Sequence, residues 1–223
     1  AAVSLPLRRR PSRACGAVVL KSLLLFGGSF DPIHHGHLIV ARFIAEHLDV
    51  GRVTLIPSAS PPHKQQQRMT PAAARLAMCR LAVADDRLFE VSDWEVGRPG
   101  PNFSIDTVSH FRQTVGSDIE LCWLIGMDSL LELKTWHRAS ELVDQCTIVT
   151  TARPGCTPPE PSGLAPRFSP PQMERLLGHI VAGPQIDIAG TDIRARVRSG
   201  RSIRFLVPEA VRGYIGQHAL YRD

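Results

Sequence analysis

The segment from Gly27 to His37 holds the residue types best suited to binding phosphates. It reads Gly-Gly-Ser-Phe-Asp-Pro-Ile-His-His-Gly-His and follows an apolar run. Paired glycines let a ligand approach the backbone closely, and a helix beginning here would present free amides at the positive end of its dipole. His34 and His37 stand on either side of Gly36 and add two imidazole donors. Backbone donors, side-chain donors and little bulk together predict a site for a triphosphate.

The two histidines allow two other interpretations. A His-x-x-His pair can bind zinc, but the neighbouring sequence offers no evident third ligand. Two histidines in a surface turn are the second alternative, and the paired glycines ahead of them argue against it. The sequence therefore favours phosphate binding and predicts no metal site built by the protein itself.

A second candidate phosphate contact lies near the C-terminus. Thr191 begins a predicted helix after a predicted strand, and Arg194 falls in the first turn of that helix. A hydroxyl, helix amides and a planar guanidinium would therefore converge on one anion. A capped helix with a solvated arginine is the alternative, and we assign Arg196 and Arg198 to the solvated face.

The elements that must position these residues are strands and helices in alternation. Apolar, β-branched runs predict strands, and apolar stripes at helical spacing predict helices. Strands are predicted at 18–26, 52–56, 88–91, 121–125, 147–150 and 185–188. Helices are predicted at 38–48, 71–84, 104–115, 130–143, 173–180, 191–199 and 208–218. This alternation indicates an α/β domain with a mostly parallel sheet, whose ligands bind outside the carboxyl ends of the strands where the strand order reverses.

Length and composition indicate one folded domain. The chain has 223 residues, of which 43% are apolar and 21% charged, and this excludes a disordered or fibrous chain. We divide it into a basic, disordered lead-in at 1–20 and a single domain at 21–223, of which about 190–223 is a small helical part. Residues 153–171 hold seven prolines in nineteen positions, which predicts a surface loop without regular structure.

The net charge of +5 is concentrated at the N-terminus. The first 21 residues hold five basic and no acidic residues, so the remaining chain holds 21 of each. The domain is then nearly neutral and we expect no nucleic-acid partner, with RNA binding by the lead-in as the alternative. The lead-in also imitates a signal peptide, but Lys21 interrupts its apolar stretch and no cleavage site follows.

Cysteine usage and hydropathy indicate the compartment. The five cysteines are scattered without a Cys-x-x-Cys pair, which is typical of free thiols in a reducing compartment. No apolar run approaches the roughly 18 residues of a membrane span. We therefore expect a cytoplasmic protein without a membrane partner.

Several motifs together resemble one family. Gly27 to Pro32 followed by His-x-Gly-His resembles the nucleotidyltransferases of the class I synthetase-like superfamily. Later motifs are similar, in their order, to those of bacterial nicotinate-mononucleotide adenylyltransferases. These motifs are Pro61-Pro62-His63-Lys64, Ile125-Gly126-Met127-Asp128-Ser129-Leu130 with Thr135-Trp136, Arg153-Pro154-Gly155, Thr191-x-Ile193-Arg194 and Ser202 to Pro208. The resemblance covers about residues 21–222.

The resemblance implies a Rossmann-like, doubly wound fold of the H-x-G-H type and an enzyme of NAD biosynthesis. Enzymes of this family join ATP and nicotinate mononucleotide into nicotinate adenine dinucleotide and pyrophosphate. The attacking group is a phosphate oxygen that is mostly ionised near neutral pH, since its second pKa is about 6. No general base is needed, so the protein has to position phosphates and stabilise charge. Mg²⁺ carried mainly by ATP is the expected cofactor.

The resemblance also implies roles for individual residues. His34, His37 and Arg194 are expected to act on the transferring phosphates. The expected ATP contacts are Gly27, Gly28, Ser29, Phe30, Gly36, Ile125, Gly126, Asp128, Arg153 and Thr191. The expected nicotinate mononucleotide contacts are Lys64, Ser104, Thr107 and Trp136. A surface lysine and a core tryptophan remain the alternatives for Lys64 and Trp136.

Two motifs depart from the family pattern. The usual Ile-Ser-Ser/Ala-Thr is Ile188-Ala189-Gly190-Thr191 here, so one serine hydroxyl that would contact phosphate is missing. The usual Ser-Tyr-Thr-x-x-Thr is Asn102-Phe103-Ser104-Ile105-Asp106-Thr107, in which Ser104 keeps a hydroxyl and Thr107 is retained. Another nucleotidyltransferase, such as the pantetheine-phosphate enzyme, and a nucleotide sensor without turnover are the alternative functions.

Overall fold

A six-stranded parallel sheet forms the centre of the molecule. The computed structural model describes residues 21–222 except 61–68, 99, 153–158 and 165–166. The strands are β1 (Ser22–Gly28), β2 (Val53–Pro57), β3 (Phe89–Val91), β4 (Glu120–Gly126), β5 (Thr147–Ala152) and β6 (Ile180–Ala182). Their order is β3-β2-β1-β4-β5-β6, and every neighbouring pair is parallel. This is the order of a doubly wound Rossmann sheet, so the predicted fold class is confirmed.

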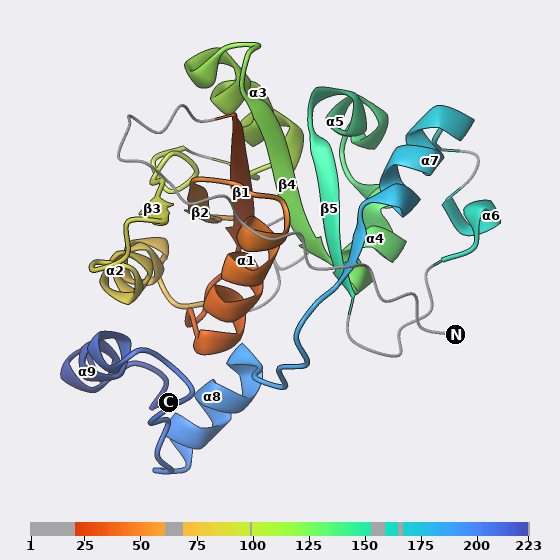
Figure 1. Ribbon diagram of the computed structural model, residues 1–223. Coiled ribbons are helices and arrows are strands. Elements are labelled where there is room, and N and C mark those ends of the chain that lie inside the picture. The colour runs from red at the N-terminus through yellow and green to blue at the C-terminus, as the bar shows by residue number, and fades with distance from the viewer. Residues whose placement is uncertain (1–20, 61–68, 99, 153–158, 165–166, 223) are drawn as a thin grey trace, which may run out of the picture.

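Helices cover both faces of the sheet (Figure 1). They are α1 (His35–His47), α2 (Ala72–Ala82), α3 (Ser104–Val115), α4 (Met127–Glu132), a 3₁₀ turn η2 (Leu133–Thr135), α5 (Ala139–Gln145), α6 (Pro161–Leu164), α7 (Pro170–Gly178), α8 (Gly190–Arg198) and α9 (Glu209–Gln217). Buried side chains of α1, α2, α8 and α9 form one core cluster, and those of α3, α5 and α7 form a second cluster. The sheet therefore separates two hydrophobic cores.

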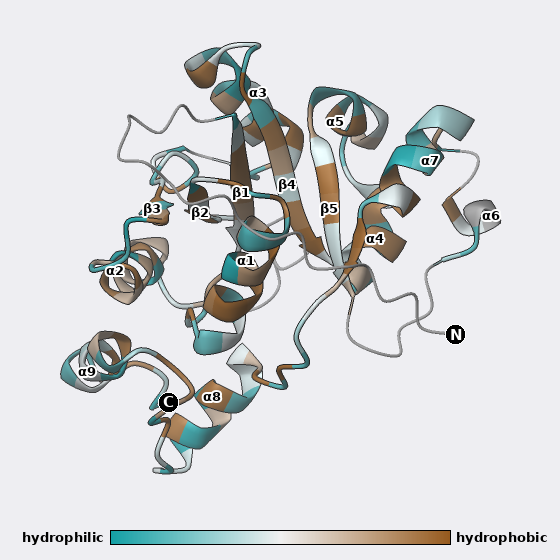
Figure 2. Cartoon of the chain, viewed as in Figure 1, coloured by the Kyte–Doolittle hydropathy of each residue, from teal (hydrophilic) through white to brown (hydrophobic). Residues whose placement is uncertain are grey.

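The central strands are apolar because both of their faces are buried. Successive side chains of a strand point to opposite faces, so β4 contributes alternately to the two clusters. Leu124 belongs to the cluster with α1, and Trp123 and Ile125 belong to the cluster with α3. Figure 2 shows the resulting hydrophobic strands between helices of mixed polarity. A continuous apolar run is the expected sequence of such a strand.

The predicted single helix at 130–143 is wrong. The chain forms α4, η2 and α5 instead, with Trp136 in an extended conformation (φ −68°, ψ 148°). Arg138 is left-handed (φ 51°, ψ 41°) and precedes α5. Leu130, Leu133 and Leu142 are nevertheless buried in the same cluster, so their apolar spacing reports burial rather than one continuous helix.

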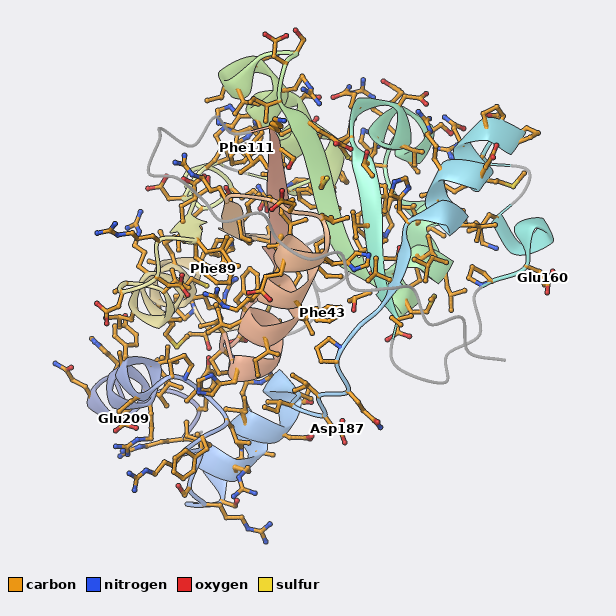
Figure 3. All side chains as sticks on the ribbon, in the orientation of Figure 1. Phe43, Phe89, Phe111, Glu160, Asp187 and Glu209 are labelled. Atoms are coloured by element: carbon orange, nitrogen blue, oxygen red, sulfur yellow. The ribbon has the colours of Figure 1, made fainter. Side chains whose placement is uncertain are left out.

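The predicted strand at 185–188 is also wrong. The last strand is β6, where Ile180 pairs with Thr150 of β5. Residues 185–188 have no regular secondary structure and lie outside the sheet, with Asp187 exposed to solvent (Figure 3). Ile188 of this segment packs against the core cluster with α1, so alternate burial arises here without strand pairing.

The proline-rich segment at 153–171 contains regular structure, in contrast to its prediction as a loop. It includes α6, and α7 begins at Pro170 rather than at residue 173. Ser169 caps α7 by accepting a hydrogen bond from the amide of Gln172. Proline is compatible with the first turn of a helix because the amide it lacks would have no partner there.

The other predicted elements are present, with ends that differ by a few residues. The helix α3 has the predicted bounds, whereas α1 begins three residues before the predicted residue 38. The lead-in at 1–20 lies outside the described residues. None of the described helices is both long enough and apolar enough to span a membrane.

Candidate active site

A pocket of about 520 Å³ lies where the strand order reverses, at the carboxyl ends of β1 and β4. Binding sites of doubly wound sheets lie at this point. The pocket brings together many of the expected site residues. These are Gly27, Gly28, Ser29, Ser104, Ile125, Gly126 and Trp136. A cavity of this size is in the usual range for a small ligand.

Gly27 shows why the end of β1 has to be small. A Cβ atom at this position would lie 2.7 Å from Cζ2 of Trp123. Trp123 is buried in the core and also lines the pocket. The indole ring therefore packs directly on the backbone of the loop from Gly27 to His37, which we call the phosphate loop.

The rings of His34 and His37 stack at the start of α1, with their centroids 3.7 Å apart. Nδ1 of His37 accepts a hydrogen bond from the backbone amide of His34 at 3.3 Å. An acceptor nitrogen carries no proton, so the neutral ring of His37 carries its proton on Nε2. Phe30 packs edge-on against the same ring, 5.1 Å away, and restrains it further. His37 is therefore held as a donor whose direction is set by the backbone.

His34 is buried and neutral. It is 6% exposed, and its Nδ1 has no hydrogen-bond partner among the described residues. Burial lowers the pKa of His34 to about 4, with a smaller contribution from the charge of His35. A Cβ atom at position 36 would lie 3.0 Å from His34 Nδ1, which accounts for Gly36 in the motif.

We expect His34 to make the folded protein less stable as the pH falls from about 6.5 to about 4. The unfolded chain binds a proton at the usual histidine pKa of 6.5, and the folded protein does not until about 4. Because the unfolded state then binds more protons, the free energy of unfolding rises with pH in this window. The shift corresponds to a loss of up to about 3 kcal/mol at its acid end.

Urea unfolding of the wild type and of His34→Asn at pH 7 and pH 4.5 measures this effect. Asparagine is a good residue at a helix N-cap and does not titrate, so the variant should lose less stability on acidification. Equal losses in the two proteins would contradict the assignment of a low pKa to His34.

Arg194 reaches the phosphate loop from the first turns of α8. Its Nη1 donates a hydrogen bond to the backbone oxygen of Asp31 at 2.6 Å, across 163 residues of sequence. The N-cap of α8 is Ala189, which provides no side-chain cap. A Cβ atom on Gly190 would lie 3.0 Å from the Asp31 oxygen, so the small residue allows the close approach. Thr191 is exposed in the first turn of the same helix. Arg194 and the start of α8 thus lie beside the loop that carries His34 and His37.

Two hydroxyl residues of α3 have different surroundings. Ser104 is half-buried and lines the pocket. Thr107 is fully buried, does not line the pocket, and donates a hydrogen bond from Oγ1 to Oε1 of Glu95 at 2.6 Å. The structure therefore brings Ser104 to the pocket and places Thr107 behind its wall.

The remaining expected contacts have mixed placements. Trp136 is half-buried and forms part of the pocket wall. Asp128 is exposed on the first turn of α4, beside the pocket but outside its lining. Lys64 and Arg153 lie outside the described residues.

Arg75 is a site-forming residue that sequence reasoning missed. It is 1% exposed, and its guanidinium donates to the backbone oxygens of Ser29 at 2.5 Å and Thr70 at 2.8 Å. Burial lowers the pKa of Arg75, and the nearby carboxylate of Asp31 opposes that shift. An arginine in an amphipathic helix normally indicates a solvated face, so no signal in the sequence marks it.

Glu95 and Asn102 form a second set of residues that sequence reasoning missed. Oδ1 of Asn102 accepts hydrogen bonds from the amides of Ala59 at 3.0 Å and Ser60 at 2.9 Å. Burial raises the pKa of Glu95, and hydrogen bonds from Thr107 and Ser58 oppose the shift. Together they join the end of β2 to the start of α3 and support one side of the pocket.

The sheet is doubly wound, and a loop rich in glycine and histidine lies at its switch point with a pocket beside it. These features define a Rossmann-type nucleotidyltransferase of the H-x-G-H kind. Comparison with known proteins gives the particular family. The family profile described as cytidylyltransferase-like matches residues 25–196. A Thermomicrobium roseum protein, named probable nicotinate-nucleotide adenylyltransferase, is 42% identical over 205 residues, which cover 91% of this chain and 92% of that protein. The chain belongs to the nicotinate-nucleotide adenylyltransferase family.

Other relatives have the same name, and a solved structure has the same fold. The proteins of the same name from Geobacter sulfurreducens and Thermus thermophilus are 38% and 41% identical, over 88% and 89% of this chain and 96% and 98% of their own lengths. The solved Plasmodium falciparum nicotinic acid mononucleotide adenylyltransferase, complexed with NaAD, has a TM-score of 0.70 at 16% identity. That likeness covers 90% of this chain and 97% of the other, and it confirms the fold.

Proposed function

We propose that the protein transfers the adenylyl group of ATP to the phosphate of nicotinate mononucleotide and releases pyrophosphate, as a step of NAD biosynthesis. Membership of the family supports this activity. The main structural support for this activity is that the pocket borders the phosphate loop, since Gly28 and Ser29 of the loop line the pocket. A mononucleotide in the pocket would have its phosphate next to His37 and Arg194, where the phosphates of ATP would bind.

The chemistry suits a site made of donors. An oxygen of the mononucleotide phosphate attacks the α-phosphorus of ATP, and the bond from that phosphorus to the bridging oxygen breaks as pyrophosphate leaves. The attacking phosphate is already ionised, so no proton has to be removed. We assign the stabilisation of the developing charge to His37 and Arg194, because fixed donors act most strongly where charge develops.

We propose that ATP enters as its magnesium complex. Within the part of the chain that the structure describes, no three His, Cys, Asp or Glu side chains lie close enough together to hold a metal ion. The triphosphate would then be the main ligand of Mg²⁺, which usually binds substrate phosphates with only one or two protein groups.

The proposed partners are ATP and nicotinate mononucleotide, and we propose that the reaction takes place in the cytoplasm. The described cysteines Cys79, Cys122 and Cys146 are free and buried. Free thiols are typical of a reducing compartment.

The start of α3 is the proposed site of the ring carboxylate. The N-cap of this helix, Phe103, provides no side-chain cap, and Ser104 lines the pocket. Uncapped amides and a helix dipole favour a negative group. No lysine or arginine is among the described residues that line the pocket. Selection of acid over amide would therefore rest on hydrogen bonds rather than on a salt bridge.

We expect kcat/KM for nicotinate mononucleotide to exceed that for nicotinamide mononucleotide by at least about tenfold. The amide would place its own NH₂ donors against the donors of the site and leave buried groups unpaired. Ser104→Ala should lower the ratio of the two kcat/KM values, because it removes one hydrogen-bond donor. Ser109→Ala is the matched control, because Ser109 lies on the same helix and its hydroxyl donates to Gln145. Equal kcat/KM values for the two substrates in the wild type would overturn the assignment of the ring site.

The activity itself is tested by pyrophosphate release with ATP and a panel of acceptors that includes nicotinate mononucleotide, nicotinamide mononucleotide and phosphopantetheine. Release only with a pyridine mononucleotide, and a product of the mass of the dinucleotide, would support the proposal. Tight binding of ATP without turnover of any acceptor would favour a sensor instead.

A further inference from the structure

The C-terminal part of the chain contacts the phosphate loop at three points. Arg194 donates to the backbone oxygen of Asp31, and the amide of His35 donates to the backbone oxygen of Leu206 at 3.0 Å. The hydroxyl of Tyr221 donates to Oδ1 of Asp31 at 2.7 Å, across 190 residues of sequence. Figure 1 shows α8, α9 and the C-terminus together beside the N-terminal end of α1. The segment from Arg194 to Tyr221 therefore encloses one side of the loop.

Asp31 is the residue on which these contacts converge. It is 9% exposed, and its second carboxylate oxygen accepts a hydrogen bond from the amide of Thr70 at 3.3 Å. The carboxylate also faces the buried guanidinium of Arg75, which holds the adjacent Ser29. Its backbone oxygen is the acceptor for Arg194. A shift of Asp31 would therefore move Arg194 as well as the phosphate loop.

Tyr221 is held in one position. Its backbone is left-handed (φ 63°), a conformation that residues other than glycine rarely adopt, and its ring packs against the core cluster with α1. Burial and the neighbouring carboxylate of Asp31 both raise the pKa of Tyr221, so the hydroxyl remains a donor at neutral pH. The ring packs against the core and the hydroxyl bonds Asp31. Substitution can therefore separate the effect of packing from the effect of the hydrogen bond.

We propose that Tyr221 is a positioning residue for adenylyl transfer. Its hydroxyl holds the Asp31 carboxylate, Asp31 in turn holds the guanidinium of Arg194, and Arg194 then faces the phosphates of ATP. Tyr221 itself touches neither substrate. This inference rests on the proposed function of the phosphate loop.

Tyr221→Phe tests the role of the hydroxyl because it keeps the ring. We expect binding of MgATP, measured by calorimetry, and kcat/KM for ATP each to weaken about tenfold, as for loss of a hydrogen bond to a charged group. KM for nicotinate mononucleotide should change less than KM for ATP, because none of Asp31, Arg194 and Tyr221 lines the pocket assigned to the mononucleotide. Tyr214→Phe is the matched control, since Tyr214 is half-buried on α9 and its ring contacts the tilted ring of His218.

A thermal melt separates positioning from a merely structural role. A lower Tm with unchanged MgATP affinity and kcat/KM for ATP, measured well below that Tm, would overturn the proposal. So would equal effects on the KM values of both substrates. In an Asp31→Ala background, Tyr221→Phe should have no further effect, and a second tenfold loss there would mean that Tyr221 acts through packing. Absence of wild-type turnover would refute the proposed function, while the calorimetric comparison would still decide the role of Tyr221 in nucleotide binding.

Discussion

Replacing His37 with alanine should lower kcat about 10²–10³-fold while the protein stays folded. His37 is the donor whose orientation is best determined, because its Nδ1 accepts the amide of His34 and Phe30 packs against its ring. A fixed donor needs no reorganisation when negative charge develops on the phosphates. Its removal should therefore affect the transition state more than the binding of either substrate.

Steady-state kinetics of His37→Ala, with circular dichroism and a thermal melt to check folding, measure this effect. His47→Ala is the control, because His47 is exposed on the same helix and stacks on Phe43. The control should keep wild-type kinetics. A folded His37→Ala protein with near-normal turnover would remove His37 from the phosphate site.

Arg194→Ala should lower kcat/KM for ATP by roughly 10²-fold, and Arg194→Lys should recover only part of that loss. One nitrogen of the guanidinium donates to the backbone oxygen of Asp31, which holds the planar group at the phosphate loop. Lysine keeps the positive charge. Its ammonium has no planar fork and cannot donate to Asp31 and to a phosphate with the same geometry.

The comparison of the two substitutions decides how Arg194 acts. Arg201→Ala removes the same charge from an exposed position just beyond α8 and should leave the kinetics unchanged. Full recovery by lysine would mean that only the charge matters. Normal kinetics in both Arg194 variants would mean that the arginine only joins α8 to Asp31 and takes no part in the reaction.

Sequence reasoning located most of the elements and singled out the loop from Gly27 to His37, because both depend on local patterns. Apolar strands and amphipathic helices have periods that can be read along the chain, and the two glycines and two histidines stand within eleven residues. The same reasoning failed between 130 and 143. The buried leucines there have helical spacing although the chain turns at Trp136. They have this spacing because the short elements α4, η2 and α5 all pack on the same core.

The supporting residues could not be predicted because their partners are distant in sequence. Arg75 holds the backbone oxygen of Ser29, 46 residues away, and nothing in its own helix distinguishes it from a solvated arginine. Thr107 was expected to contact substrate from its place in a motif. Its buried hydroxyl is instead directed to Glu95, and only the packing of α3 against the loop around Glu95 shows this.

The contacts of Asp31 also bear on how the chain folds. Tyr221 is 190 residues and Arg194 is 163 residues from their common partner. Closing a longer loop costs only about 0.6 kcal/mol for each doubling of its length, so this separation scarcely weakens the finished structure. The long separation slows folding instead, because the entropy of closing the loop is lost before contacts between distant residues can stabilise the chain. The loop from Gly27 to His37 is synthesised early, yet it acquires Arg194 and Tyr221 only after nearly the whole domain has followed it.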